Sequence, residues 1–152
     1  MTIQSIGSVS GAVAVKRLLK AAIRSEINYA PAEDDPVHGF LNYLDGAENV
    51  FVLSAAASGQ DKMDDIAREI IAEAAEEMLG ECRILVLVAS GAITEAVESH
   101  DAFDFAFMSA QSPIRILNAV REAIKPETEI EISAYIDESL IDKAVATVFI
   151  AK

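Results

Sequence analysis

The last part of the chain, residues 129–151, constrains the fold more than any other segment. Apolar and polar side chains alternate through 129–136, as on a strand with one buried face. Residues 144–151 are almost continuously apolar and rich in β-branched side chains, which is typical of a strand covered on both faces. The polar link 137–143 is short enough to return the chain antiparallel to itself. We therefore predict that the chain ends in an antiparallel hairpin that closes a sheet.

Length and composition indicate a single globular domain. The chain has 152 residues, 52% of them apolar, which is enough for a substantial core and argues against disorder. No apolar run approaches the roughly 18 residues of a membrane span, and residues 1–7 lack the charged lead of a signal peptide. The single cysteine, Cys82, excludes an intrachain disulfide. These features favour a cytoplasmic protein.

The charge balance argues against nucleic acid as a partner. Twelve basic and 25 acidic residues give a net charge of -13, which repels phosphate backbones and anionic lipids. Four of the basic side chains form the one basic cluster of the sequence, on a predicted helix at 12–27 whose other side is apolar. Two interpretations stay open for this cluster, a solvated helix face, which is the simpler one, and a binding surface. Its members are Lys16, Arg17, Lys20 and Arg24.

Helical and strand patterns alternate along the rest of the chain. After a short candidate strand at 2–6, the order is helix, strand, helix, strand, helix, strand, strand. Helices between strands imply parallel crossovers, and the closing hairpin adds antiparallel pairing. We predict an α/β fold with a mixed four-stranded sheet in two layers. The whole chain, 1–152, would form one domain, with a leading helix at 12–27 and a core at 50–152.

The clearest predicted helix begins near residue 58. Ser58 and Asp61 have the spacing of a capping box, and an apolar stripe follows. Within this helix, Asp64 and Arg68 are four residues apart and are predicted to form an ion pair.

Motifs for independent catalysis are lacking in the sequence. It contains no glycine-rich phosphate loop, so we expect no nucleotide cofactor. His38 and His100 are far apart and have no metal-ligand spacing, which predicts solvated loop histidines and no metal. Cys82 stands at the start of a buried strand, where a core role is simpler than a nucleophilic one. No serine lies in a nucleophile elbow. The sequence therefore favours a protein that is not an enzyme by itself.

The segment 91–111 fits the alternation of elements least well. Phe103, Phe105 and Phe107 alternate with smaller or polar residues, as on an edge strand or at a helix end with exposed aromatic side chains. These three residues are candidates for an interface, because aromatic side chains are enriched there, although packing in the interior is the commoner role.

The order of elements and several short motifs resemble the second half of FtsZ, the prokaryotic relative of tubulin. Residues 50–69, with Ala-Ala-Ala-Ser-Gly-Gln-Asp before an acidic amphipathic helix, are similar to that family's strand, Arg-Ala-Ser-Gly-Glu-Asp turn and helix. Residues 84–91 are similar to its Leu-Leu-Asn-Ile-Ser-Gly-Gly strand end, and 130–151 to its closing strands. The resemblance implies the chorismate-mutase-like fold of the FtsZ C-terminal domain.

The resemblance also implies a candidate loop. The first helix would match the central helix of FtsZ, and residues 39–42 the start of the loop that follows it. In the family, carboxylates of that loop complete the GTP site of the next subunit in a filament. Asn42 matches the family pattern, while Asp45 and Glu48 fit with one inserted residue. The GTP-binding half of FtsZ has no counterpart in this sequence.

Three functions follow as hypotheses. The first is a non-catalytic interaction or assembly module, linked to cell division or cytoskeletal filaments, whose partner is itself in a homo-oligomer, an FtsZ-like protein, or both. In the second, the loop 42–48 completes a GTPase site on a partner chain. In the third, a small-molecule enzyme has its site between subunits, where arginines would bind a carboxylated ligand. The candidate arginines are Arg83, Arg115 and Arg121.

Overall fold

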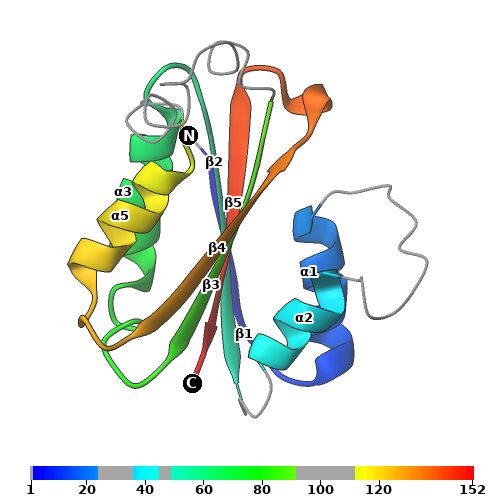
Figure 1. Cartoon of the computed structure of the whole chain (residues 1–152), viewed down its shortest axis with the longest axis vertical. Coiled ribbons are helices and arrows are strands. Elements are labelled where there is room, and N and C mark those ends of the chain that lie inside the picture. Colours follow the sequence, from blue (N-terminus) through cyan, green and yellow to red (C-terminus); the bar gives the residue numbers. More distant parts are fainter. Residues whose placement is uncertain (1, 24–35, 45–48, 92–111) are drawn as a thin grey trace, which may run out of the picture.

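The protein forms a five-stranded mixed sheet in the order β1-β2-β5-β3-β4 (Figure 1). The computed structural model describes residues 2–23, 36–44, 49–91 and 112–152. Strands β3 and β4 are parallel, and the other neighbouring pairs are antiparallel. The predicted α/β class with a mixed sheet is therefore confirmed. The strands are β1 (Thr2–Val9), β2 (Val50–Ser58), β3 (Arg83–Ser90), β4 (Glu129–Ile136) and β5 (Lys143–Ala151).

The predicted strand count of four is one too low, because β1 is a full member of the sheet. It pairs antiparallel with β2 from Thr2 opposite Ala56 to Val9 opposite Val50. The register shifts between Ser5 and Gly7, where the glycine has a positive φ of 83°. Such a bulge interrupts the two-residue alternation by which a strand is recognised in sequence.

The predicted closing hairpin is wrong in its pairing. β4 and β5 do run in opposite directions, but β3 lies between them, and β5 pairs with β2 and β3 at the centre of the sheet. The reason is burial. Almost every residue of β5 is buried, so this strand needs neighbours on both sides and cover on both faces. β4 alternates between exposed and partly buried residues and takes the edge.

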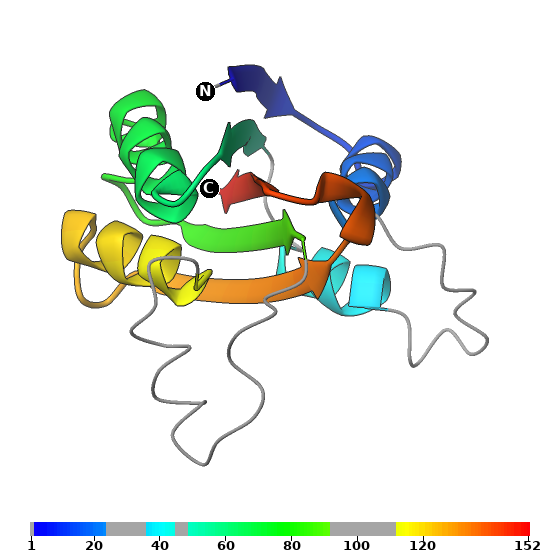
Figure 2. The same cartoon turned by 90° about the horizontal axis from the view of Figure 1, so that it is seen from above.

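Helices cover both faces of the sheet, which adds a layer to the predicted two (Figures 1 and 2). On one face α1 (Ala12–Ile23) and α2 (Pro36–Tyr43) pack through Leu19 and Phe40 onto Leu87. On the other, α3 (Lys62–Ala74) and α5 (Ile114–Ala123) pack through Ile70 and Val120 onto Val86. Successive strand residues point to opposite faces, so the unbroken apolar run of β3 supplies both cores. The predicted helix at 12–27 is confirmed as far as residue 23, where the described segment stops.

The predicted start of the second helix is wrong. Ser58 is the last residue of β2, paired with Lys143, and α3 begins four residues later without a side-chain cap. The strand extends because β5 offers it a partner along its whole length. The predicted Asp64–Arg68 pair is also wrong, since Arg68 binds Asp65 at 3.1 Å instead. Among the described residues, no helix is long and apolar enough to cross a membrane.

Candidate interaction site

Two isoleucines are exposed where the chain leaves the edge strand. Ile136, the last residue of β4, is 70% exposed, and Ile141, in the loop that follows, is 81% exposed. The loop contains a short 3₁₀ helix, η2 (Glu138–Leu140). One exposed apolar side chain is ordinary on a protein surface, whereas two within six residues make this segment a candidate contact surface. We call residues 136–142 the apolar loop.

Hydrogen bonds at its first half fix the apolar loop to the sheet. The backbone N–H of Asp137 donates to the carbonyl of Ser90 at 2.8 Å, which ties the loop to the end of β3. The Asp137 carboxylate accepts from the N–H and the hydroxyl of Ser139, at 3.1 and 2.6 Å. An aspartate that bonds two residues ahead in this way stabilises a tight turn.

The second half of the loop is fixed to the turn between β2 and α3. The N–H of Gly59 donates to Asp142, both to its carbonyl at 3.3 Å and to its Oδ2 at 3.1 Å. Asp142 Oδ1 also lies 3.8 Å from Nζ of Lys62, whose side chain is nearly buried. The loop is therefore anchored at both ends and does not depend on a partner for its shape.

Ile141 has a strained backbone. Its φ and ψ are 50° and -98°, a conformation that a β-branched residue rarely adopts and that costs about 1–3 kcal/mol. Gly91 lies directly against it, so close that a Cβ on the glycine would overlap the carbonyl oxygen of Ile141. The N–H of Gly91 donates to the carbonyl of Lys143 at 3.4 Å. These contacts hold the loop in a form that leaves the Ile141 side chain in solvent.

A second surface of distinct character lies on α1. Val13 is 70% exposed, and Lys16, Arg17 and Lys20 are exposed beside it on the same side of the helix, at the i, i+3, i+4 and i+7 spacing. None of the three basic side chains forms an ion pair with a described residue. We call these four residues the basic face. The cluster predicted from sequence is thus confirmed as one continuous surface, apart from Arg24, which lies outside the described residues.

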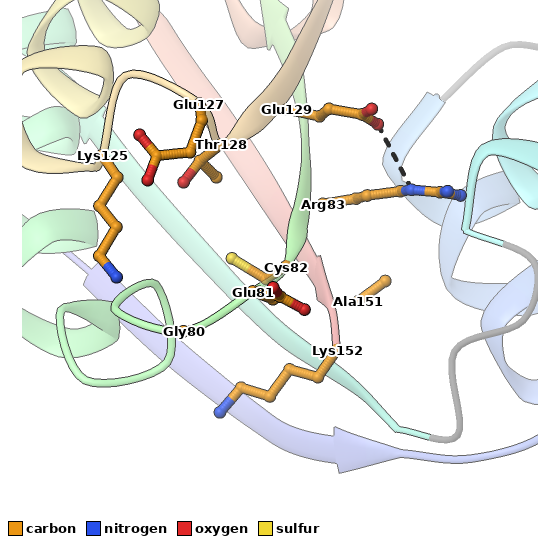
Figure 3. Close-up of a pocket in the computed structure, with 10 residues that line it drawn as sticks. All are labelled: Gly80, Glu81, Cys82, Arg83, Lys125, Glu127, Thr128, Glu129, Ala151 and Lys152. Carbon is orange, nitrogen blue, oxygen red and sulfur yellow. Dashed lines mark ion pairs between the residues drawn. The ribbon is translucent and has the colours of Figure 1, made fainter.

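A pocket of about 640 Å³ occupies the opposite end of the sheet (Figure 3). It is formed where β3 and β4 begin and β5 ends, together with the segments that precede β3 and β4. The charged side chains around it balance one another, three basic against three acidic. They are Arg83, Lys125, Lys152, Glu81, Glu127 and Glu129.

Arg83 in this pocket connects the sheet to α2. Its Nε lies 3.4 Å from Oε2 of Glu129, the residue beside it in the register of β3 and β4. Its Nη1 donates to the carbonyl of Tyr43 at 3.1 Å, and the Tyr43 hydroxyl donates to the carbonyl of Ile84 at 3.3 Å. Burial, and after it the charge of Glu129, raises the pKa of Tyr43. These interactions give Arg83 a structural role.

The thiol of Cys82 is not activated. Burial raises its pKa, and the nearby charge of Lys152 opposes that effect only in part. The Sγ–H points to the carbonyl of Met78 at 3.9 Å. A thiol with a raised pKa stays protonated near neutral pH and is a poor nucleophile. Within the described ranges, no three histidine, cysteine or acidic side chains gather as a metal site would need. The thiol that lines the pocket is therefore not an activated nucleophile.

The loop predicted from the FtsZ resemblance is only partly described. Residues 39–42 were expected to begin a loop, but they belong to α2, because Phe40 packs into the core at helical spacing from Val37 and Leu44. Asn42 is exposed on the last turn of that helix. Asp45 and Glu48 lie outside the described residues, as do Phe103, Phe105 and Phe107.

Within a single chain, the three candidate arginines lie apart, and their proposed site between subunits stays a hypothesis. Arg115 forms two 2.8 Å hydrogen bonds with Asp64, and Arg121 donates to the carbonyl of Thr128 at 2.7 Å. These two lie six residues apart on α5, about 9 Å along its axis. Arg83 lies at the far pocket and is paired as described above.

Little in the sequence pointed to the apolar loop. Its alternation placed Ile136 on the buried face of its strand with Ile130 and Ile132. After Ile132, however, the buried face of β4 changes. Ala134 and Ile136 are exposed, and Tyr135 packs against the core under α1 and α2. No residue type between 132 and 136 marks this change. Only the packing of the finished sheet reveals it.

Comparisons with known proteins find similarity in fold alone. No family model matches the chain, and no curated protein matches it in sequence. The structure is similar to that of a point mutant of FtsZ from M. jannaschii, with a TM-score of 0.54 and 12% identity. It is also similar to an empty FtsZ dimer from the same organism, with a TM-score of 0.56 and 14% identity. The match covers 92% of this chain in both cases but only 39% and 38% of the FtsZ chains. The resemblance to one part of FtsZ predicted from sequence is therefore confirmed.

Proposed function

We propose that the chain is a non-catalytic interaction or assembly module of the FtsZ and tubulin type. The observation that carries this proposal is the exposure of Ile136 and Ile141 on a loop that is anchored at both ends. Burying apolar surface in a complex gains about 25 cal/mol for each Å², so two such side chains favour association. A loop that already has its final shape loses little conformational entropy on binding.

The fold comparison supports the same function. One of the similar structures is a dimer of FtsZ, a protein that is thus seen in contact with another copy of itself. The partner that we propose for this chain is itself, an FtsZ-like protein, or both, in an assembly related to filaments or cell division. The pocket where β3 and β4 begin is a weaker candidate for a functional site. Its thiol is not activated, and Arg83 already binds Glu129 and the end of α2.

Sedimentation velocity tests the proposal. The full chain is measured over a range of concentrations, alone and with a purified FtsZ. The double variant Ile136→Ser, Ile141→Gly removes both apolar side chains, and the glycine also relieves the strained backbone. We expect association of the native chain in at least one of the two settings and its loss in the variant.

The matched control is Leu79→Ser, which removes another exposed apolar side chain outside the apolar loop. It should leave association unchanged. A native chain that stays monomeric and does not bind FtsZ at any concentration tested would refute an interaction role.

A further inference from the structure

We infer that the apolar loop docks on the basic face of a second copy of the same chain. This inference rests on the proposed function and specifies its partner. The apolar loop would place Ile141 against Val13, the exposed apolar residue of the basic face. Acidic side chains around the isoleucine would meet Lys16, Arg17 and Lys20.

The apolar loop is acidic around its exposed isoleucines. Asp137, Glu138 and Asp142 lie within the six residues that follow Ile136. Asp142 is partly neutralised by Lys62, and Asp137 bonds to Ser139, whereas Glu138 is exposed and forms no ion pair with a described residue. The loop therefore fits a partner surface that is apolar at its centre and basic around it.

The basic face has this composition. Val13 supplies the apolar centre and three cations lie beside it, none of them in an ion pair with a described residue. Two copies of a chain with a net charge of -13 repel each other at long range, so a stable contact between them needs complementary local charges. An acidic loop against a basic helix face provides this complementarity.

The positions of the two surfaces allow both contacts to form in one pair. η2 and α1 lie on the same side of the sheet, the side that α1 and α2 cover (Figure 1, right). A two-fold axis between two copies can then place the loop of each copy on α1 of the other. Such a closed arrangement forms the contact twice and produces a dimer.

Charge reversal tests this contact in the full chain by sedimentation equilibrium. The double variant Lys16→Glu, Lys20→Glu and the single variant Glu138→Lys should each weaken dimerisation by about tenfold or more, because like charges then face each other. The triple variant that combines them restores opposite charges between residue 138 and residues 16 and 20, so it should recover part of the dimerisation that either variant loses. Raising the salt concentration from about 50 mM to about 500 mM should weaken the native dimer through screening.

The control makes the same change of net charge elsewhere. Lys125→Glu with Arg68→Glu replaces two other exposed basic residues. It should weaken the dimer only through the more negative net charge of the chain. Its effect is therefore subtracted from that of Lys16→Glu, Lys20→Glu.

The outcomes separate this inference from the proposed function. If the chain dimerises through Ile136 and Ile141 but the triple variant does not recover, the basic face is not the partner surface, and the assembly role stands. If the chain binds FtsZ and never itself, the contact between copies is overturned while the interaction role is kept. If it binds neither, both are wrong.

Discussion

The carboxylate of Asp64 on α3 and the guanidinium of Arg115 on α5 form a two-pronged ion pair. Nε and Nη2 of the arginine each lie 2.8 Å from one carboxylate oxygen. The planar fork of arginine matches a carboxylate in this way, so the pair fixes direction as well as distance. It joins the two helices that cover one face of the sheet. The nearest candidate partner in sequence, Arg68, binds Asp65 instead.

The first prediction concerns acid stability. Hydrogen bonds from Arg115 lower the pKa of Asp64 below its ordinary value of 3.8. A carboxyl whose pKa is lower in the folded state stabilises the fold above its unfolded pKa, and that stabilisation is lost as pH falls through the folded value. Asp64→Asn should therefore lower the urea midpoint near neutral pH. The difference from the native chain should shrink as the pH falls below 3.8 and through the lowered pKa of Asp64.

Urea unfolding across this pH range measures the effect, which should be small because both side chains are more than one third exposed. Arg115→Lys is the matched variant, since it keeps the charge and loses the fork. It should lie between the native chain and Asp64→Asn. An equal loss of stability at every pH would contradict an electrostatic origin.

The second prediction concerns the contact beneath the apolar loop. Gly91→Ala should destabilise the fold by about 1–3 kcal/mol, because the added methyl group overlaps the backbone carbonyl of Ile141, which cannot rotate away. Gly39→Ala is a control with the opposite sign. Gly39 lies exposed within α2 with open space around it, so alanine should stabilise the fold by about 0.5–1 kcal/mol. Thermal unfolding of both variants measures the difference. Equal effects would show that Gly91 is not tightly packed.

The third prediction tests the second layer of helices. Leu19 lies on the side of α1 that faces the sheet and is fully buried. Leu19→Ala should therefore lower the free energy of unfolding by about 2–5 kcal/mol. Val13→Ala on the exposed side of the same helix should change the stability of the monomer by less than about 0.5 kcal/mol. Urea unfolding of dilute protein compares the two. A Leu19→Ala variant as stable as the native chain would mean that α1 does not pack on the sheet.

The fourth prediction concerns the thiol of Cys82. Burial raises its pKa, so alkylation by iodoacetamide near neutral pH should be slower than for a free thiol, and its rate should rise only at more alkaline pH. Lys152 opposes this shift, so Lys152→Ala should raise the pKa further and slow the reaction. The pH dependence of the alkylation rate measures both effects. A faster reaction in the variant would contradict the assigned charge effect.

Local patterns predicted the type of most elements. The apolar recurrence that begins at residue 12 predicted α1, and the apolar runs at 84–88 and 144–151 predicted β3 and β5. These patterns failed where pairing with a segment distant in sequence decides the secondary structure. Ser58 has the residue type of a helix cap, yet pairing with β5 keeps it in a strand. Thr2–Val9 has a bulge at Gly7, and its pairing with β2 makes it a strand.

The sequence by itself determined that the protein is an α/β domain with a mixed sheet, a basic helix face and a resemblance to FtsZ. These follow from periodicity, residue type and the order of the elements, all of which can be read along the chain. Only the tertiary structure decided that β3 lies between β4 and β5, that Asp64 binds Arg115 and that both Ile136 and Ile141 are exposed. Each of these depends on which distant segment packs beside a residue. For the strand order the hydrophobic effect decides, because β5 is buried on both faces and therefore lies inside the sheet.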